Sequence, residues 1–161
     1  MQTFLPYPDF EHTARVLDWR RLGKQRVEAK QILLALARGT GGWINHPAVR
    51  MWRGYEPALA IYGATICQEW RDRGYRDNLL PWFHAELRRW WLPSALAGTA
   101  DLLAGGGHPP WLGDPAFHAS HRSNLLRKAP EHYGQFGWTE PDDLVYVWPT
   151  PEGEKGAADA R

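Results

Sequence analysis

The chain of 161 residues contains a single cysteine, Cys67. One thiol cannot form an internal disulfide, and it excludes zinc sites built from several cysteines. A chain of this length can bury about two thirds of its unfolded surface, so it needs no crosslink or metal to fold. We therefore expect one domain in a reducing compartment such as the cytoplasm.

Long apolar runs are also missing. No segment approaches the roughly 20 apolar residues of a membrane-spanning helix. The first ten residues, MQTFLPYPDF, have no basic segment followed by an apolar one, which a secretory signal would require. We expect no membrane partner and a cytoplasmic location, or a nucleoid-associated one if the ligand is DNA.

Several catalytic and nucleotide-binding motifs are absent. The sequence has no Walker loop, no Rossmann glycine fingerprint, no HExxH zinc motif and no nucleophile elbow. The glycine run Gly105–Gly107 lacks the lysine and the helix start that a phosphate-binding loop needs. The enzyme classes that depend on these motifs are excluded.

Helical patterns dominate the sequence, and no set of alternating strands is present. Apolar spacing, capping residues and proline or glycine breaks predict helices from Asp9 to about Arg20 and over about 21–38, 47–53, 56–73, 78–91, 93–103, 115–128 and 131–136. We predict an all-α, compact single-domain helical bundle over residues 1–149. An extended N-terminal arm, 1–9, and a short extended segment, 144–148, flank it, and residues 150–161 form a disordered tail.

Positive charge is concentrated near the N-terminus. Between residues 15 and 30 there are six cations and two carboxylates, a local balance of +4, whereas the whole chain has a net charge of +1. Such a focus is typical of a polyanion-binding site. The alternative is a solvated helix face with ion pairs such as Lys24–Glu28.

The face pattern of the helix over 21–38 separates its charged residues. Leu22, Ile32 and other apolar residues form one stripe, and Glu28 falls on the opposite face with Arg21 and Lys24. Surrounding cations would keep Glu28 ionised, able to act as a base or to stabilise a cationic intermediate. Arg26 projects close to the apolar stripe, where it needs a partner.

A second cluster combines His118, His121 and Arg122 on one helix face. Phosphate binding by Arg122 together with a histidine is one interpretation. A metal site would need a third ligand, which the sequence does not specify, and the arginine disfavours a cation. The remaining possibility is a histidine hydrogen-bonded inside the bundle.

A third cluster begins at Asn45-His46-Pro47 and continues through Arg50 and Arg53. Cationic and aromatic residues alternate here around a helix start, as at an edge that binds phosphates or stacks on bases. The chain has ten Trp, six Tyr and five Phe. Most of these must be core, and the alternative for this cluster is capping plus core packing.

Five stretches carry a family resemblance over about residues 1–149. They are MQTFLPYPDF, VLDWRRLGKQRVEA, NHPAVRMWRGYE, PPWLGDPAFHASHRSNLLRKAPEHY and YVWP. They resemble a widespread bacterial and phage family of pyrimidine-dimer DNA glycosylase/endonuclease V proteins. Similarity to the phage members is concentrated in the basic helix, where the catalytic glutamate corresponds to Glu28, and in the pattern Pro130, Tyr133, Phe136 and Gly137.

The resemblance implies a DNA repair glycosylase with AP-lyase activity that acts on pyrimidine dimers in double-stranded DNA. An N-terminal α-amine would attack the sugar C1′, release the base and form a Schiff base, and β-elimination would nick the strand. No metal or organic cofactor is implied, and a monomer is expected. The chemistry is reasonable because an α-amine has a pKa near 8, so a useful fraction is neutral at pH 7.

One position departs from the phage pattern, in which a threonine amine is exposed after removal of methionine. Here residue 2 is glutamine, a bulky side chain that normally blocks this removal. The candidate catalytic residues are therefore Met1 or Gln2 as the amine and Glu28 as the carboxylate, with Lys24 as a different lyase nucleophile. The predicted DNA-binding residues are Arg20, Arg21, Lys24, Arg26, His46, Arg53, His118, His121 and Arg122.

Two other functions remain open from the sequence. A non-catalytic nucleic-acid-binding protein could use the same basic helix, and its binding would be indifferent to Glu28→Gln. A metal-dependent hydrolase could be built on His118 and His121, and a chelator would remove its activity.

Overall fold

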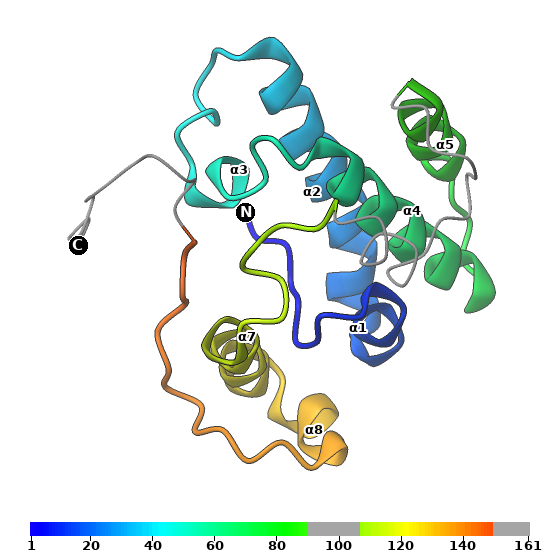
Figure 1. Ribbon diagram of the computed structural model, residues 1–161. Helices are drawn as coiled ribbons and strands as arrows, with labels where there is room; N and C mark the ends of the chain where they lie inside the picture. Colours follow the sequence, from blue (N-terminus) through cyan, green and yellow to red (C-terminus); the bar gives the residue numbers. More distant parts are fainter. Residues whose placement is uncertain (90–106, 150–161) are drawn as a thin grey trace.

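The computed structural model (Figure 1) describes residues 1–89 and 107–149 and confirms the all-α class. Within these ranges there are seven α-helices, one 3-10 turn and no strand. The elements are α1 (Phe10–Val16), α2 (Trp19–Arg38), α3 (Pro47–Arg50), α4 (Glu56–Asp72), α5 (Leu80–Arg89), α7 (Pro115–Lys128), α8 (Pro130–Tyr133) and η1 (Gly134–Phe136). The predicted helix over 93–103 and the predicted tail over 150–161 lie outside the described residues.

The helix ends follow the capping residues. Asp9 caps α1 by accepting a hydrogen bond from the His12 amide at 2.7 Å, and Asp114 caps α7 through the Ala116 amide at 3.0 Å. His46 caps α3, with its Nδ1 accepting from the Ala48 amide at 3.0 Å. Gly39 ends α2 in the left-handed conformation, at φ 66°, where glycine is favoured.

One predicted boundary is wrong. Trp19 and Arg20 were expected at the end of the first helix, but they open α2. Leu17 is extended and ends α1, and the Asp18 carboxylate caps the next helix by accepting from the Arg21 amide at 3.4 Å. The boundary between the two helices therefore lies at Asp18, a second capping aspartate, and not after Arg20, where the apolar spacing predicted it.

Other boundaries differ from expectation by a few residues. The helix that begins at Pro47 stops at Arg50, and hydrogen-bonded turns carry the chain on to Gly54. The helix after Gly74 begins at Leu80, because Asp77 Oδ2 accepts hydrogen bonds from the Leu79 and Leu80 amides at 3.2 and 2.8 Å. The helix over 115–128 is confirmed as predicted.

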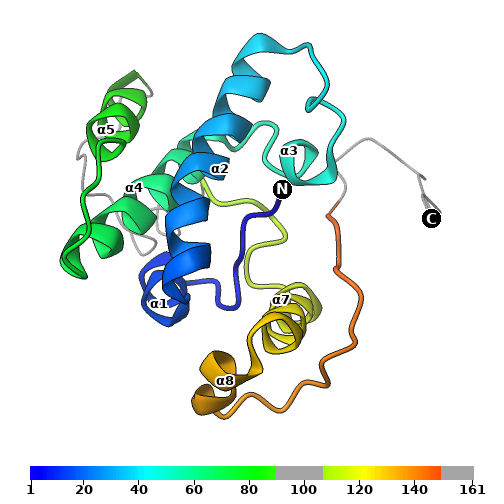
Figure 2. The ribbon, with the colours of Figure 1, turned by 180° about the vertical axis from the view of Figure 1, so that it is seen from behind.

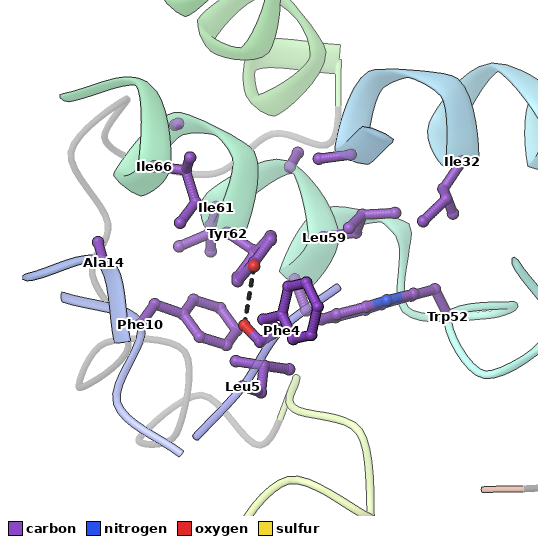
Figure 3. Close-up of a cluster of buried hydrophobic side chains, with 14 of the residues drawn as sticks. Phe4, Leu5, Phe10, Ala14, Ile32, Trp52, Leu59, Ile61, Tyr62 and Ile66 are labelled. Carbon is purple, nitrogen blue, oxygen red and sulfur yellow. Dashed lines mark hydrogen bonds between the residues drawn. The ribbon is translucent and has the colours of Figure 1, made fainter. Parts of the chain in front are cut away.

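The core forms where α4 packs against α1, α2 and α5. Tyr62 and Trp52 are fully buried in it, and Figure 3 shows them beside Phe4 and Leu5 of the N-terminal arm. Trp111 is also buried, whereas Trp43 is 55% exposed. Of these tryptophans, only Trp43 has a ring that is free to meet a ligand from solvent.

The N-terminal arm and the C-terminal segment both link the helices that precede residue 90 with those that follow residue 106. In both ribbon views the arm passes between α2 and α7 (Figures 1 and 2). The segment over 137–149 leaves α8 and returns along the outside towards α3. The predicted extended stretch over 144–148 is neither helix nor strand, with Tyr146 and Trp148 packed on the core and Val145 85% exposed. No helix in the described part of the chain is long and apolar enough to cross a membrane.

Arg26 has the partner that its position near the apolar stripe requires. Its guanidinium lies 2.5 and 2.7 Å from Oδ1 of Asp77, and it stacks over the Trp70 ring at 5.1 Å. The Arg26 side chain is 12% exposed and that of Asp77 is fully buried. Burial raises the pKa of Asp77, but the Leu80 amide and Arg26 outweigh it and lower the pKa of that carboxyl overall.

We expect Asp77→Ala to lower the free energy of unfolding by about 3–5 kcal/mol, because it leaves the buried Arg26 charge unpaired. Urea unfolding at pH 7 measures this loss. The matched control is Asp72→Ala on the exposed surface of α4, where Asp72 only accepts from Gln68, and it should cost less than about 0.5 kcal/mol. Equal costs for the two variants would contradict a structural role for the Arg26–Asp77 pair.

Candidate active site

The N-terminal arm is buried without belonging to a helix or a strand. Gln2, Thr3, Phe4, Leu5 and Pro6 are all buried, and Thr3 and Leu5 are completely inaccessible. Buried peptide groups must be hydrogen-bonded, and this segment has no neighbouring strand to supply partners. Side chains from three helices supply them instead.

Gln25 of α2 provides the partners on one side. Its Nε2 donates to Gln2 O at 2.8 Å and to Glu28 Oε2 at 3.0 Å, and its Oε1 accepts from the Phe4 amide at 2.9 Å. The Tyr62 hydroxyl lies 2.7 Å from Gln25 Oε1 and 2.9 Å from Phe4 O (Figure 3). This fully buried amide thereby fixes both the arm and the carboxylate of Glu28.

Two histidines of α7 provide the partners on the other side. His121 Nδ1 accepts from the Leu5 amide at 2.9 Å, and His118 Nδ1 lies 2.8 Å from Leu5 O. His118 Nε2 accepts from the Gly113 amide at 2.8 Å, so its proton is on Nδ1. The two neutral rings thus have opposite tautomers, and together they satisfy both backbone groups of Leu5.

The remaining arm contacts complete this enclosure. Trp52 Nε1 donates to Thr3 Oγ1 at 3.0 Å, and Arg122 donates to Pro6 O at 2.8 Å while pairing with Glu140 at 2.6 Å. The surface presented by the predicted cluster at 118–122 is therefore turned towards the arm. His118 and His121 are 3% and 1% exposed, so in this arrangement neither ring faces a ligand in solvent.

Glu28 lies at the start of the arm. Its Oε2 accepts from the Gln2 backbone amide at 3.2 Å, and its Oε1 is 3.6 Å from Lys24 Nζ. The helix pattern placed Glu28 on an exposed face, and that expectation is wrong because the arm covers it and leaves it 7% exposed. The predicted Lys24–Glu28 pair is present, with the lysine largely in solvent.

Glu28 opens on a cleft of about 790 Å³ between the arm, α2 and the start of α8. The lining also includes Met1 and Gln2, the cations Arg20, Arg21, Lys24 and Lys128, the carboxylates of Asp18 and Glu131, and the rings of His132 and Tyr146. Trp19 is 54% exposed at the same cleft, and Arg20 stacks over it at 5.3 Å. A cationic cleft with an exposed aromatic ring suits a nucleic-acid strand.

Asp18 lines this cleft but is engaged in the fold. It accepts hydrogen bonds from the Tyr133 hydroxyl and from Arg21, the latter at 3.2 Å. Although burial opposes the effect, these two partners lower the pKa of Asp18, while burial and Asp18 raise the pKa of Tyr133. The Asp18 charge is therefore internally compensated, and the cations beyond it face the cleft.

The two remaining predicted groups lie outside the cleft lining. Arg26 points to Asp77 on another side of α2 and serves the fold. His46 caps α3 and Arg53 follows that helix, and α3 lies close to the N-terminus in Figures 1 and 2. Burial lowers the pKa of His46, the N-terminal ammonium lowers it further, and Glu28 acts in the opposite direction. The N-terminal ammonium and the Glu28 carboxylate are therefore both close enough to His46 to influence its pKa.

The sequence did not identify five residues that build the site: Gln25, Tyr62, Lys128, His132 and Tyr146. Gln25 and Tyr62 occupy ordinary positions in helical patterns. The last three are brought to the cleft by contacts across more than a hundred residues, for which one sequence carries no signal. No group of three or more possible metal-ligating side chains occurs within residues 1–89 and 107–149.

A buried N-terminal arm that meets a carboxylate at the end of a cationic cleft defines a site of the kind expected in an enzyme acting on DNA. Residues 1–81 match the model of a family described as pyrimidine dimer DNA glycosylase. The match covers just over half of the 161-residue chain, and the chain belongs to this family. No curated protein and no solved structure matches it. The matched part contains the arm and Glu28, whereas α7 lies beyond it.

The two arm-binding histidines predict acid sensitivity. Burial lowers the pKa of His118, and it lowers that of His121 to about 3. In the unfolded chain both histidines have ordinary pKa values near 6.5, so below this pH they bind protons that the folded chain does not bind. Their contribution to the free energy of unfolding is therefore complete above pH 6.5 and is lost as the pH falls. For His121 alone we expect a loss of roughly 2 kcal/mol between pH 7 and pH 5.

Urea unfolding at the two pH values measures this loss. His121→Gln keeps an acceptor for the Leu5 amide but does not titrate, so its stability should fall less between pH 7 and 5 than that of the wild type. The matched control is His12→Gln, which changes an exposed ring and should leave the wild-type pH dependence intact. A His121→Gln protein with the full wild-type loss would refute the assignment.

Proposed function

We propose that this protein is a DNA repair glycosylase with AP-lyase activity that excises damaged pyrimidines, pyrimidine dimers in particular, from double-stranded DNA. Its nucleophile is the N-terminal α-amine. The observation that carries the proposal is the 3.2 Å contact between the backbone nitrogen of residue 2 and Glu28 Oε2, at the end of a cationic cleft. Membership of the pyrimidine dimer DNA glycosylase family supports it.

The two oxygens of Glu28 have different surroundings that suit this chemistry. Oε2 is held by the Gln2 amide and by Gln25. Within the described residues Oε1 pairs with Lys24, whose side chain is 74% exposed and can turn away at little cost. Oε1 is then the oxygen that stabilises positive charge on the sugar as the bond to the base breaks.

The reaction proceeds in two stages. The neutral amine forms a bond to C1′ as the C1′–N1 bond breaks, and the electron pair of that bond leaves with the pyrimidine. The nitrogen loses a proton to water, the C1′–O4′ bond breaks and O4′ takes a proton from water, which gives a protonated imine, the Schiff base. This electron-poor centre acidifies the C2′ proton. Water takes that proton, a C2′=C3′ double bond forms, and the C3′–O bond breaks so that the 3′ phosphate leaves with its electron pair and the strand is nicked. Glu28 balances the iminium charge throughout.

DNA contacts are assigned to the cations that line the cleft. Arg20, Arg21 and Lys24, with Lys128 opposite, bind backbone phosphates. Trp19 offers a stacking surface. His46 and Arg53 extend this interface at the side of α3. Arg26 is left out of the set because it pairs with the buried Asp77 and does not line the cleft, whereas Arg21 and Lys24 line it although each has a carboxylate partner.

His118, His121 and Arg122 receive a different role in the proposal. They bind the arm at Leu5 and Pro6, and we assign them to holding the amine against Glu28. An arm fixed in advance reduces the entropy that the reacting amine must lose in the transition state.

Either of two amines fits the site. With Met1 retained, its amine is one residue beyond the Gln2 nitrogen and lines the same cleft. With Met1 removed, the residue 2 nitrogen already in contact with Glu28 would be the amine. The bulk of Gln2 favours retention, so we assign the amine to Met1, and the intact mass of the purified protein reports which is present.

The proposal predicts that borohydride traps a covalent complex with duplex DNA that contains an abasic site or a pyrimidine dimer. Selective acylation of the N-terminal amine should abolish trapping, because an amide nitrogen is not nucleophilic. Denaturing electrophoresis of labelled DNA measures the trapped fraction. Trapping that survives acylation but is lost in Lys24→Ala would contradict the amine assignment, and absence of both trapping and nicking would refute the enzyme.

The variant Glu28→Gln distinguishes the glycosylase from a non-catalytic nucleic-acid-binding protein. This change keeps the shape at the arm but removes the charge that stabilises the cationic intermediate, so we expect base release to fall about 100-fold or more. Affinity for dimer-containing duplex at fixed salt should change by less than about threefold, because Glu28 is not a phosphate ligand. Single-turnover assays and binding titrations measure the two. An unchanged rate would contradict the role of Glu28.

A further inference from the structure

The side chain of Gln2 has a buried donor without a partner. Its Oε1 accepts from the Thr3 amide at 2.9 Å, but its Nε2 has no hydrogen-bond partner among residues 1–89 and 107–149, although Gln2 is only 7% exposed. The same residue lines the cleft beside Glu28. Burial raises the pKa of Tyr146 to about 12, and the neighbouring Gln2 side chain opposes this shift.

The unpaired Gln2 amide nitrogen is costly, and it contrasts with the backbone amides of residues 2–5, which all donate hydrogen bonds. Leaving a buried donor unpaired costs about 1–3 kcal/mol. Gln25, a few ångströms away across the Gln2 carbonyl, shows the opposite case, since its amide uses both its nitrogen and its oxygen. Unpaired polar groups of this kind are typical of positions that meet a ligand. The ligand must bring an acceptor, because Nε2 can only donate.

The position of Gln2 limits which acceptor it can meet. Its backbone nitrogen contacts Glu28, so its side chain belongs to the part of the cleft where the sugar C1′ must be placed. The carbonyl oxygen O2 of a pyrimidine is attached to the ring carbon next to N1, and it is therefore the base acceptor nearest to the breaking C1′–N1 bond. Phosphates have the cationic walls of the cleft as alternative partners.

We propose that Gln2 Nε2 donates a hydrogen bond to O2 of the departing pyrimidine and stabilises it as a leaving group. This inference rests on the proposed glycosylase function. As the amine bonds to C1′, the electron pair of the C1′–N1 bond moves onto the pyrimidine, where N1 and O2 share the negative charge. The ammonium formed at the amine loses a proton to water, and the pyrimidine anion gains one from water. A fixed N–H donor at O2 is strongest when that charge has developed.

The test compares cleavage of the C1′–N1 bond in a dimer-containing duplex, called base release here although the pyrimidine stays joined to its dimer partner, with nicking of a duplex that already has an abasic site. Only the first step has a leaving pyrimidine. Gln2→Met keeps the size of the side chain, and as a bulky residue 2 it keeps Met1, which intact mass verifies. Gln2→Glu also removes the donor but keeps an oxygen for the Thr3 amide. The matched control is Gln31→Met on the exposed face of α2.

In both Gln2 variants we expect single-turnover base release to fall about 10- to 100-fold relative to abasic-site nicking. Gln31→Met should leave this ratio within about twofold of the wild type. Equal losses in both steps would show that Gln2 only holds the arm, and an unchanged ratio would show that it does not touch the base. Either result overturns the inference while wild-type activity preserves the proposed function. A wild-type protein that acts on neither substrate overturns the proposed function itself.

Discussion

The structure depends on one constraint: an irregular, buried N-terminal segment must have every peptide group hydrogen-bonded by side chains. A helix or a strand satisfies this need through its own ladder, but residues 2–6 have neither. Gln25, Tyr62 and the histidine pair of α7 take the place of that ladder. The first helices and the C-terminal third of the fold are consequently tied together through the chain terminus.

This arrangement explains why polar residues occupy the centre of an otherwise apolar bundle. Gln25 is fully buried and His121 is 1% exposed, positions that packing alone would assign to leucine or phenylalanine. Gln25 is held by four hydrogen bonds, and His121 accepts one from the Leu5 amide, so these buried polar groups have partners. Replacing them by apolar residues would remove partners from the arm rather than merely change the core.

The fold positions the charged side chain of Glu28 as well as the backbone of the N-terminal arm. Glu28 combines a backbone contact to residue 2 with a side chain contact to Gln25, both on Oε2. Oε2 of the carboxylate is therefore fixed by the arm and by Gln25, Oε1 pairs with the exposed Lys24, and Glu28 lines the cleft. Since the cations of the cleft belong to α2 and to the end of α7, a DNA strand bound there would lie across the same two elements that hold the arm.

Local features of the sequence predicted much of the fold. Aspartates and prolines at helix starts, and glycines at helix ends, marked most boundaries, because capping depends on neighbouring residues alone. The need of Arg26 for a partner also followed from its position on the helix. The apolar spacing did not predict that Asp18 caps α2, because the spacing continues past Asp18 without a break.

The site was only partly predictable from the sequence. Glu28 and the basic residues of α2 stood out through charge, and the family resemblance supplied the role of the amine. The burial of Glu28 did not follow, because it comes from an arm that leaves no mark in the periodicity of α2. The use of His118 and His121 also depends on contacts with residue 5, more than a hundred positions away.

The central claim of this account is that the α-amine beside Glu28 is the group that bonds to the sugar. The most direct test is peptide mapping by mass spectrometry of the borohydride-reduced complex, which identifies the residue that carries the deoxyribose. The account predicts the adduct on the α-nitrogen of the N-terminal peptide. An adduct on the peptide that contains Lys24 or Lys128 would contradict it.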